Sequence, residues 1–177
     1  MKIIGRFIVV LLVSFLAING SYAMGQFFFF ENPLIGQKAP DFTLNSIYQK
    51  NLNLTTMRNG KPVIIFFWAT WCPHCRVQLD TIHNSQADLE AKGVQVALVD
   101  LGESAKLVQA YMSANHMTMD VFLDEDGSVS DAYGVIGIPT FIFVNAEGVV
   151  RAVENDIPEN YEQILFSSGT LTPGDGS

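Results

Sequence analysis

Short apolar runs recur through the middle of the chain and predict the strands of a sheet. Residues 63–68 (VIIFFW) and 140–144 (TFIFV) consist almost wholly of apolar side chains, many of them β-branched or aromatic. Such runs are typical of strands that are buried on both faces, as in parallel sheets. Further short strands are predicted at residues 42–44, 52–54, 94–99 and 121–123, and at 149–153 after a hairpin turn at 145–148.

Segments with helical periodicity lie between these runs. Residues 73–92 stop before Gly93, a residue that often ends a helix, and residues 103–115 follow the next strand. Their expected apolar faces are Val77, Leu79, Ile82 and Leu89 in the first and Leu107, Val108, Tyr111 and Met112 in the second. Shorter helices are predicted over residues 128–133 and from Pro158 to about Phe166. Alternating strands and helices indicate an α/β fold with helices on both faces of the sheet.

The first 23 residues have the pattern of a secretory signal peptide. Two basic residues precede an apolar run over residues 7–18, and Ser21 and Ala23 stand at the −3 and −1 positions of a cleavage site. An uncleaved membrane anchor is the alternative, since extending the run through residue 23 gives a helix of about 26 Å against a hydrocarbon core of about 30 Å. Either way, the rest of the chain is predicted to be extracytoplasmic, in the periplasm or secreted.

The remaining chain reads as one domain with short extensions. Residues 24–32 form an apolar leader with four adjacent phenylalanines, Phe27–Phe30, which could pack on the domain, lie at a membrane surface or extend the signal. Residues 33–166 are predicted to form the domain, and residues 167–177, which are rich in Gly, Ser, Thr and Pro, are predicted to be a flexible tail.

The charge of the chain changes the picture of its partners. The net charge is −8, and removal of the two basic residues of the signal leaves eight basic and eighteen acidic residues, a net charge of −10. This acidity argues against a nucleic-acid partner, which requires a basic face. Only two cysteines are present, which excludes a disulfide-dense scaffold and a four-thiolate metal site within one chain.

Both cysteines belong to one motif, Trp71-Cys72-Pro73-His74-Cys75, between a buried strand and a helix. A helix N-terminus carries unpaired N–H groups and about half a positive charge, which stabilise a thiolate. Cys72 is therefore expected to be the nucleophile and Cys75, one turn further on, the less exposed resolving thiol. His74 is either an exposed spacer or a group that stabilises the Cys72 thiolate, which would make the disulfide a stronger oxidant.

Other interpretations of the cysteines are less satisfactory. A structural disulfide that closes a loop of four residues stabilises the fold by about 1.9 kcal/mol, against about 3 kcal/mol for one that closes a loop of fifteen residues. A zinc site needs two further ligands, and the only candidates are His74, His83 and His116. Soft side chains that could hold copper are Met112, His116, Met117 and Met119. A helix face and the turn after it explain that group more simply, so no metal or cofactor is expected.

A second motif, Gly137-Ile138-Pro139-Thr140, opens the strand at residues 140–144. Proline is unusual at the start of a buried strand because it cannot donate to the ladder. A cis peptide bond before Pro139 would resolve this and bring the backbone of Ile138 beside the dithiol, free to pair with an extended substrate strand. An ordinary turn proline is the alternative.

Together these motifs resemble the thioredoxin superfamily, and more closely its TlpA/ResA-like (AhpC/TSA-redoxin) branch of extracytoplasmic thiol–disulfide oxidoreductases. The matching stretches are IGQKAPDFTL (35–44), FFWATWCPHC (66–75), FLDEDGSVSDAYGVIGIPTFIF (122–143) and NAEGVV (145–150). The resemblance implies a thioredoxin fold, in which helices flank a central mixed sheet, with an N-terminal β-hairpin extension and a central β/α insertion at residues 94–124. It also implies redox-active Cys72 and Cys75, a cis Pro139, and a Trp71 that shields the site.

Two positions depart from the pattern of that superfamily. Thioredoxins have a buried acid where this chain has Phe66, and ResA-like reductants have a glutamate where it has Gln78. The Pro73-His74 dipeptide resembles that of DsbA-type oxidants, whereas members of the branch usually reduce their targets, for example in cytochrome c maturation. The whole-chain resemblance favours a reductant that acts on protein substrates and is served by a membrane or periplasmic redox partner.

Three other functions are compatible with the sequence. The first is a DsbA-like oxidant. The second is a peroxiredoxin-type peroxidase, although peroxide activation in that family needs a threonine where this chain has Ala69. The third is a metal chaperone that uses the cysteines as ligands.

Overall fold

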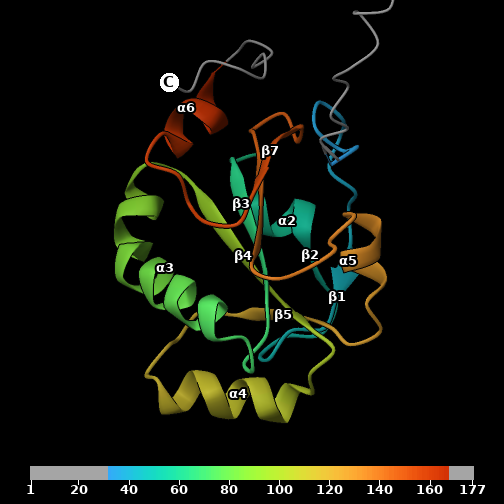
Figure 1. The fold of residues 1–177 in the computed structure, drawn as a ribbon, viewed down its shortest axis with the longest axis vertical. Coiled ribbons are helices and arrows are strands. Elements are labelled where there is room, and N and C mark those ends of the chain that lie inside the picture. The colour runs from blue at the N-terminus through green and yellow to red at the C-terminus, as the bar shows by residue number, and fades with distance from the viewer. Residues whose placement is uncertain (1–31, 168–177) are drawn as a thin grey trace, which may run out of the picture. The chain divides into compact units, whose positions relative to one another are not determined.

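Two β-sheets organise residues 32–167, the part of the chain that the computed structural model describes (Figure 1). The expectations for the signal peptide, for Phe27–Phe30 and for the tail beyond Ser167 lie outside the described residues. Between residues 32 and 167, no helix is both long and apolar enough to cross a membrane.

The central sheet has five strands in the order β5-β4-β3-β6-β7. Strands β3, β4 and β5 are parallel, while β6 runs antiparallel to β3 and β7 antiparallel to β6, so the mixed sheet expected from the resemblance is confirmed. The strands are β3 (Val63–Trp68), β4 (Gln95–Leu101), β5 (Val121–Asp124), β6 (Thr140–Val144) and β7 (Val150–Glu154). The region predicted as an insertion contributes β4, β5 and the helix between them.

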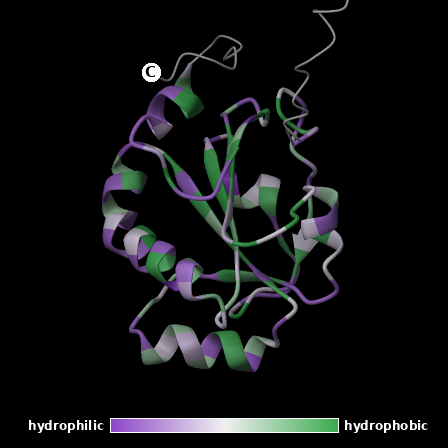
Figure 2. Cartoon of the chain, viewed as in Figure 1, coloured by the Kyte–Doolittle hydropathy of each residue, from purple (hydrophilic) through white to green (hydrophobic). Residues whose placement is uncertain are grey.

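Helices cover both faces of this sheet, as the alternation of side chains along β3 requires. Ile64, Phe66 and Trp68 point to one face and pack with α3 (Pro73–Ala91), α4 (Ala105–Ala114) and α6 (Tyr161–Phe166). The intervening residues of β3 point to the other face, which carries α2 (Leu54–Arg58) and α5 (Ser128–Ala132). Figure 1 shows α3 and α5 on opposite sides of the sheet, and Figure 2 shows hydrophobic residues gathered in the central strands.

Helix α3 begins and ends close to the predicted residues. Cys72 is its N-cap, and Gly93 follows the C-cap in the left-handed region, at φ +76°. The buried residues of α3 are Cys75, Leu79, Ile82 and Leu89. Val77 was expected in this stripe but is 63% exposed, and Leu107 of α4 is likewise exposed. Both predictions were wrong because the faces of α3 and α4 that the sheet covers are narrower than the apolar stripes in the sequence.

The N-terminal extension contains a hairpin and a short helix. Strands β1 (Thr43–Leu44) and β2 (Leu52–Asn53) pair antiparallel, which confirms the predicted hairpin. Leu54 was predicted to end the second strand, but it starts α2 instead. The side chain of Asn53 accepts a hydrogen bond of 2.9 Å from the N–H of Thr56, and this cap starts the helix.

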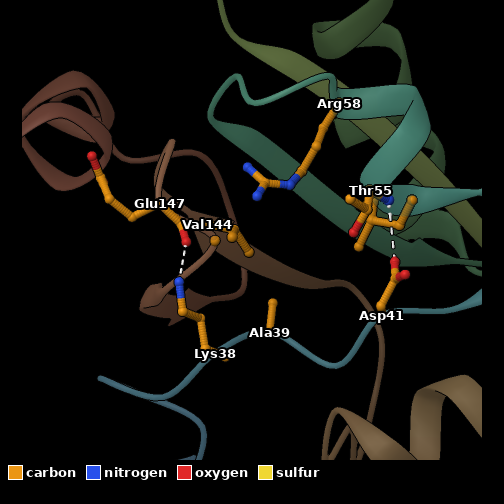
Figure 3. A pocket seen from close by; sticks show the side chains of 9 residues that line it. Lys38, Ala39, Asp41, Thr55, Arg58, Val144 and Glu147 are labelled. Atoms are coloured by element: carbon orange, nitrogen blue, oxygen red, sulfur yellow. Dashed lines mark hydrogen bonds between the residues drawn. The ribbon is translucent and has the colours of Figure 1, made fainter.

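Arg58, at the end of α2, extends its guanidinium toward the turn between β6 and β7 (Figure 3). Its Nη1 donates to the carbonyl oxygens of Lys61 and Ala146, each at 3.0 Å. Lys38 donates to the carbonyl of Glu147 in the same turn. These cations line a small pocket of about 160 Å³, but both are directed at backbone carbonyls of the protein itself.

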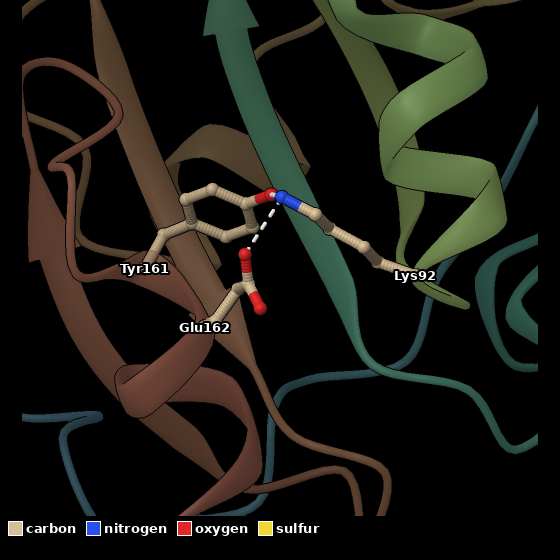
Figure 4. Close-up of polar contacts among 3 residues, drawn as sticks. All are labelled: Lys92, Tyr161 and Glu162. Atoms are coloured by element: carbon tan, nitrogen blue, oxygen red, sulfur yellow. Dashed lines mark hydrogen bonds and ion pairs between the residues drawn. The ribbon is translucent and has the colours of Figure 1, made fainter.

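Helix α6 begins at Tyr161 rather than at Pro158, because residues 158–160 form a turn in which the N–H of Tyr161 bonds the carbonyl of Pro158. Lys92, at the end of α3, joins this helix to the rest of the domain (Figure 4). Its Nζ lies 2.7 Å from the carboxylate of Glu162 and 3.0 Å from the hydroxyl of Tyr161, and the bond to Glu162 raises the pKa of Lys92. Such an exposed pair adds little to stability.

Candidate redox site

The two cysteines form a disulfide where β3 passes into α3, with their Cα atoms 5.2 Å apart. As the N-cap of α3, Cys72 accepts a hydrogen bond at its Sγ from the backbone N–H of Cys75, at 3.2 Å. Cys72 is 5% exposed and Cys75 is completely buried, so the predicted difference in exposure is confirmed. The helix N-terminus therefore lies directly at the less buried of the two cysteines.

The loop before β6 lies against the same sulfur. The peptide bond between Ile138 and Pro139 is cis, as expected, and the carbonyl oxygen of Ile138 lies 3.9 Å from the Sγ of Cys72. This approach is a contact, since a disulfide sulfur has no hydrogen to donate. The hydroxyl of Thr140 bonds the carbonyl of Gly137 across 2.6 Å and fixes the loop on its other side. The structure thus brings Cys72, Ile138 and Pro139 together.

An open hollow of about 530 Å³ lies beside this loop. His74, Ile138 and Pro139 line it together with Gln78 and Ile136. Ile136 is fully exposed at this hollow, and the exposed Val77 also lines it. The remaining residues of the motif are also accessible: Pro73 and His74 are exposed, and Trp71 is 65% exposed, so most of its indole faces solvent.

An aromatic stack occupies the position at which thioredoxins have a buried acid. Phe66 is completely buried and stacks on Phe141, with ring centroids 4.3 Å apart and planes 9° apart. Trp68 extends the stack on the same face of the sheet. Gln78 is half-buried in the wall of the hollow. Neither position can accept a proton from the resolving thiol as a carboxylate would.

Two carboxyl groups that the sequence did not predict as part of the site, those of Glu103 and Asp100, lie beside the loop before Cys72. The carboxylate of Glu103 accepts hydrogen bonds from the N–H and the hydroxyl of Thr70, at 2.6 and 2.7 Å. The N–H of Glu103 in turn donates to Asp100, which lies opposite Trp68 in the sheet and is completely buried. Burial, reinforced by Glu103, raises the pKa of Asp100 to about 8.

The histidines and methionines considered as metal ligands do not form a binding site in the described residues. Within residues 32–167, no three His, Cys, Asp or Glu side chains are placed to hold a metal ion together. Met112, Met117 and Met119 are buried in the hydrophobic core, while His116 is exposed. These methionines are thus part of the core packing on that face of the sheet.

Comparison with known proteins agrees with this arrangement. Residues 35–153 match the AhpC/TSA family. The chain is 33% identical over 143 residues to the thiol-disulfide oxidoreductase ResA of Bacillus subtilis, covering 80% of this chain and 78% of that protein. It is 33% identical over 124 residues to the thiol:disulfide interchange protein DsbE of Yersinia pestis, covering 68% and 64%. A solved structure described as a DsbE from Chlorobium tepidum superposes with a TM-score of 0.65 at 30% identity, covering 73% of this chain and 92% of that one. The fold is therefore the predicted thioredoxin fold.

Proposed function

Because the chain belongs to the AhpC/TSA family and is related to the thiol–disulfide oxidoreductases ResA and DsbE, we propose that it reduces disulfides of protein substrates outside the cytoplasm. The observation that carries this proposal is the disulfide at the start of α3, in which the sulfur of Cys72, the less buried of the two cysteines, lies beside the Ile138 carbonyl. Cys72 and Cys75 are the proposed catalytic residues.

The proposed reaction starts from the reduced pair. The Cys72 thiolate attacks one sulfur of a substrate disulfide, forming a mixed disulfide, and the displaced substrate sulfur leaves as a thiolate that takes up a proton. Cys75 then loses its proton and attacks the Sγ of Cys72, which releases the second substrate sulfur to be protonated in turn. Two electrons and two protons pass to the substrate, and the enzyme is left with the Cys72–Cys75 disulfide. A dithiol protein in the membrane or periplasm must reduce it again.

The surface around the site supports a protein rather than a small molecule as substrate. The exposed side chains of Trp71, Val77 and Ile136 offer apolar area beside Cys72, where a polypeptide could bury it. The backbone of Ile138 stands next to the sulfur and is available to an extended strand, a mode of recognition in which main-chain hydrogen bonds align the partner. Pro73 and His74 border this surface and are the proposed modulators of the thiol.

Turnover and redox equilibrium together test the proposal. The purified domain should reduce insulin disulfides when a dithiol regenerates it, and Cys72→Ser should abolish this activity. The Cys72–Cys75 couple should equilibrate with glutathione near −270 mV, as a reductant does, whereas a value near −120 mV would indicate an oxidant. Rapid peroxide consumption, or one metal ion per chain after purification under reducing conditions, would favour the peroxidase or the metal chaperone instead.

The proposed location rests on residues 1–23. The full chain, expressed in a bacterial host, should be found outside the cytoplasm. A mature N-terminus at Met24, measured by mass spectrometry, supports cleavage of a signal peptide, and an intact N-terminus in the membrane fraction supports an anchor. Recovery of the intact chain from the cytoplasm would contradict the proposed location.

A further inference from the structure

Glu103 binds the loop that leads into the redox motif. Its two carboxylate oxygens receive separate hydrogen bonds from Thr70, one from the backbone and one from the hydroxyl. Thr70 lies only two residues before Cys72, so the Cα atoms of these two residues are at most about 7.6 Å apart. The N–H of Cys72 closes a tight turn by bonding the carbonyl of Ala69. The position of Cys72 thus depends on a backbone segment that Glu103 holds at its centre.

Asp100 contacts Glu103 from the buried side. Because burial favours a neutral Asp100, the two carboxyl groups do not both carry a charge. Asp100 is completely buried on the sheet face that also carries Trp68 and Cys75. Its Oδ1 accepts from the N–H of Glu103 at 3.2 Å, while its Oδ2 has no hydrogen-bond partner, an arrangement that disfavours an ionised carboxylate. A neutral Asp100 leaves one negative charge, on Glu103, close to the redox motif.

We propose that Glu103 is a positioning residue of the dithiol site, which orders residues 69–71 and places a negative charge that disfavours the Cys72 thiolate. This inference rests on the proposed function. A thiolate stabilises the dithiol form of the couple, so a charge that opposes it favours the disulfide and lowers the reduction potential. The charge of Glu103 opposes the field of the α3 N-terminus and makes the enzyme a better reductant than its Pro73-His74 dipeptide would indicate.

The variant Glu103→Gln tests this assignment. The amide oxygen can still accept from the Thr70 N–H, and the amide can donate to the hydroxyl, so the loop should keep its conformation while the charge is lost. We expect the pKa of the Cys72 thiol to fall and the equilibrium with glutathione to shift about threefold to tenfold toward the dithiol. A tenfold shift corresponds to about 30 mV. The other titratable groups around the site are Asp100, His74, Arg76, Asp80, Tyr111 and Asp156, and none of them is replaced in the variant.

Three controls separate the electrostatic effect from a structural one. Glu159→Gln removes the same charge from an exposed position before α6 and should leave the equilibrium unchanged. Glu103→Asp keeps the charge and should restore a value close to that of the wild type. Thr70→Val removes one hydrogen bond and should lower the free energy of unfolding without shifting the redox equilibrium.

Several outcomes would overturn the assignment. One is a Glu103→Gln protein that is less stable but has an unchanged Cys72 pKa and an unchanged equilibrium with glutathione. Another is an equal redox shift in Thr70→Val. Should Glu103→Gln fail to fold, the wild-type protein still decides, because a Cys72 pKa below about 5 would show a stabilised thiolate despite Glu103. None of these measurements uses a protein substrate, so they remain valid even if no protein disulfide is turned over.

Discussion

The backbone N–H of Cys75 donates a hydrogen bond to the sulfur of Cys72 across 3.2 Å. The residue proposed to resolve the mixed disulfide therefore also helps to stabilise the sulfur that forms it. This bond comes from the backbone, so it survives replacement of the Cys75 side chain. Variants at position 75 consequently test the resolving step separately from the attacking step.

Cys75→Ser should accumulate mixed disulfides between Cys72 and its substrates, because the attacking thiol is retained and the resolving thiol is lost. Non-reducing gels with reduced enzyme and oxidised insulin would show the linked species, and Cys72→Ser is the matched control that should form none. Equal turnover of insulin by the wild type and Cys75→Ser would contradict the assigned roles.

Ile136→Ser should weaken the use of protein substrates more than that of small disulfides. The side chain is fully exposed beside the hollow, and burying part of it against a partner is worth about 1 kcal/mol, or about fivefold in kcat/KM. Steady-state reduction of insulin should fall by this factor, while reduction of a small aromatic disulfide should not change. Ile35→Ser, at another exposed isoleucine, is the control. Equal losses on both substrates would argue against docking at this surface.

Asp100→Asn should stabilise the protein at neutral pH. The stabilising contribution of a neutral Asp100 is complete below 3.8, the ordinary pKa of aspartate, and is lost as the pH rises toward its folded value of about 8. Asparagine avoids this loss, so the free energy of unfolding at pH 7 should rise by on the order of 2 kcal/mol. Urea unfolding at pH 5, 7 and 8.5 would measure the difference. The exposed Asp88→Asn should show no such trend, and a wild-type stability that climbs between pH 5 and 8 would contradict the prediction.

Gly148→Ala should destabilise the domain by about 1 to 2 kcal/mol or more. Gly148 has φ +79°, and an added Cβ would lie 2.9 Å from the Arg58 guanidinium, which binds the β6–β7 turn. Gly36→Ala is a close control, because Gly36 has φ +83° but no atom within 4 Å of an added Cβ. Urea unfolding of both variants separates backbone strain from the clash. A smaller loss for Gly148→Ala than for Gly36→Ala would be inconsistent with the proposed contact.

The sequence predicted best those elements whose pattern is local and continuous. The strands β3 and β6 begin and end at the predicted residues, because every position in them is buried on one face or the other. Helix α2 was missed because it is short and its first residue, Leu54, continues the apolar pattern of the strand before it. Val77 was misplaced because an apolar residue on a helix can remain exposed where no other element packs against it.

The candidate site was predictable only where its residues are close in sequence. Cys72 and Cys75 are set by one motif, and the cis Pro139 follows from a second motif typical of the family. Asp100 and Glu103 carry no such signal, because the predicted strand ended at Val99 and their role depends on pairing with β3. One clue was available, since continuing the alternation from Leu98 puts the carboxyl of Asp100 on the core side of the sheet.

The slight exposure of Cys72 has a consequence for the choice of substrate. Only 5% of this residue is accessible, with the Ile138 carbonyl 3.9 Å away on one side. A disulfide held rigidly inside a folded protein cannot present its sulfur at so narrow an opening. Access alone should therefore favour disulfides in flexible or locally unfolded segments over disulfides buried in rigid domains.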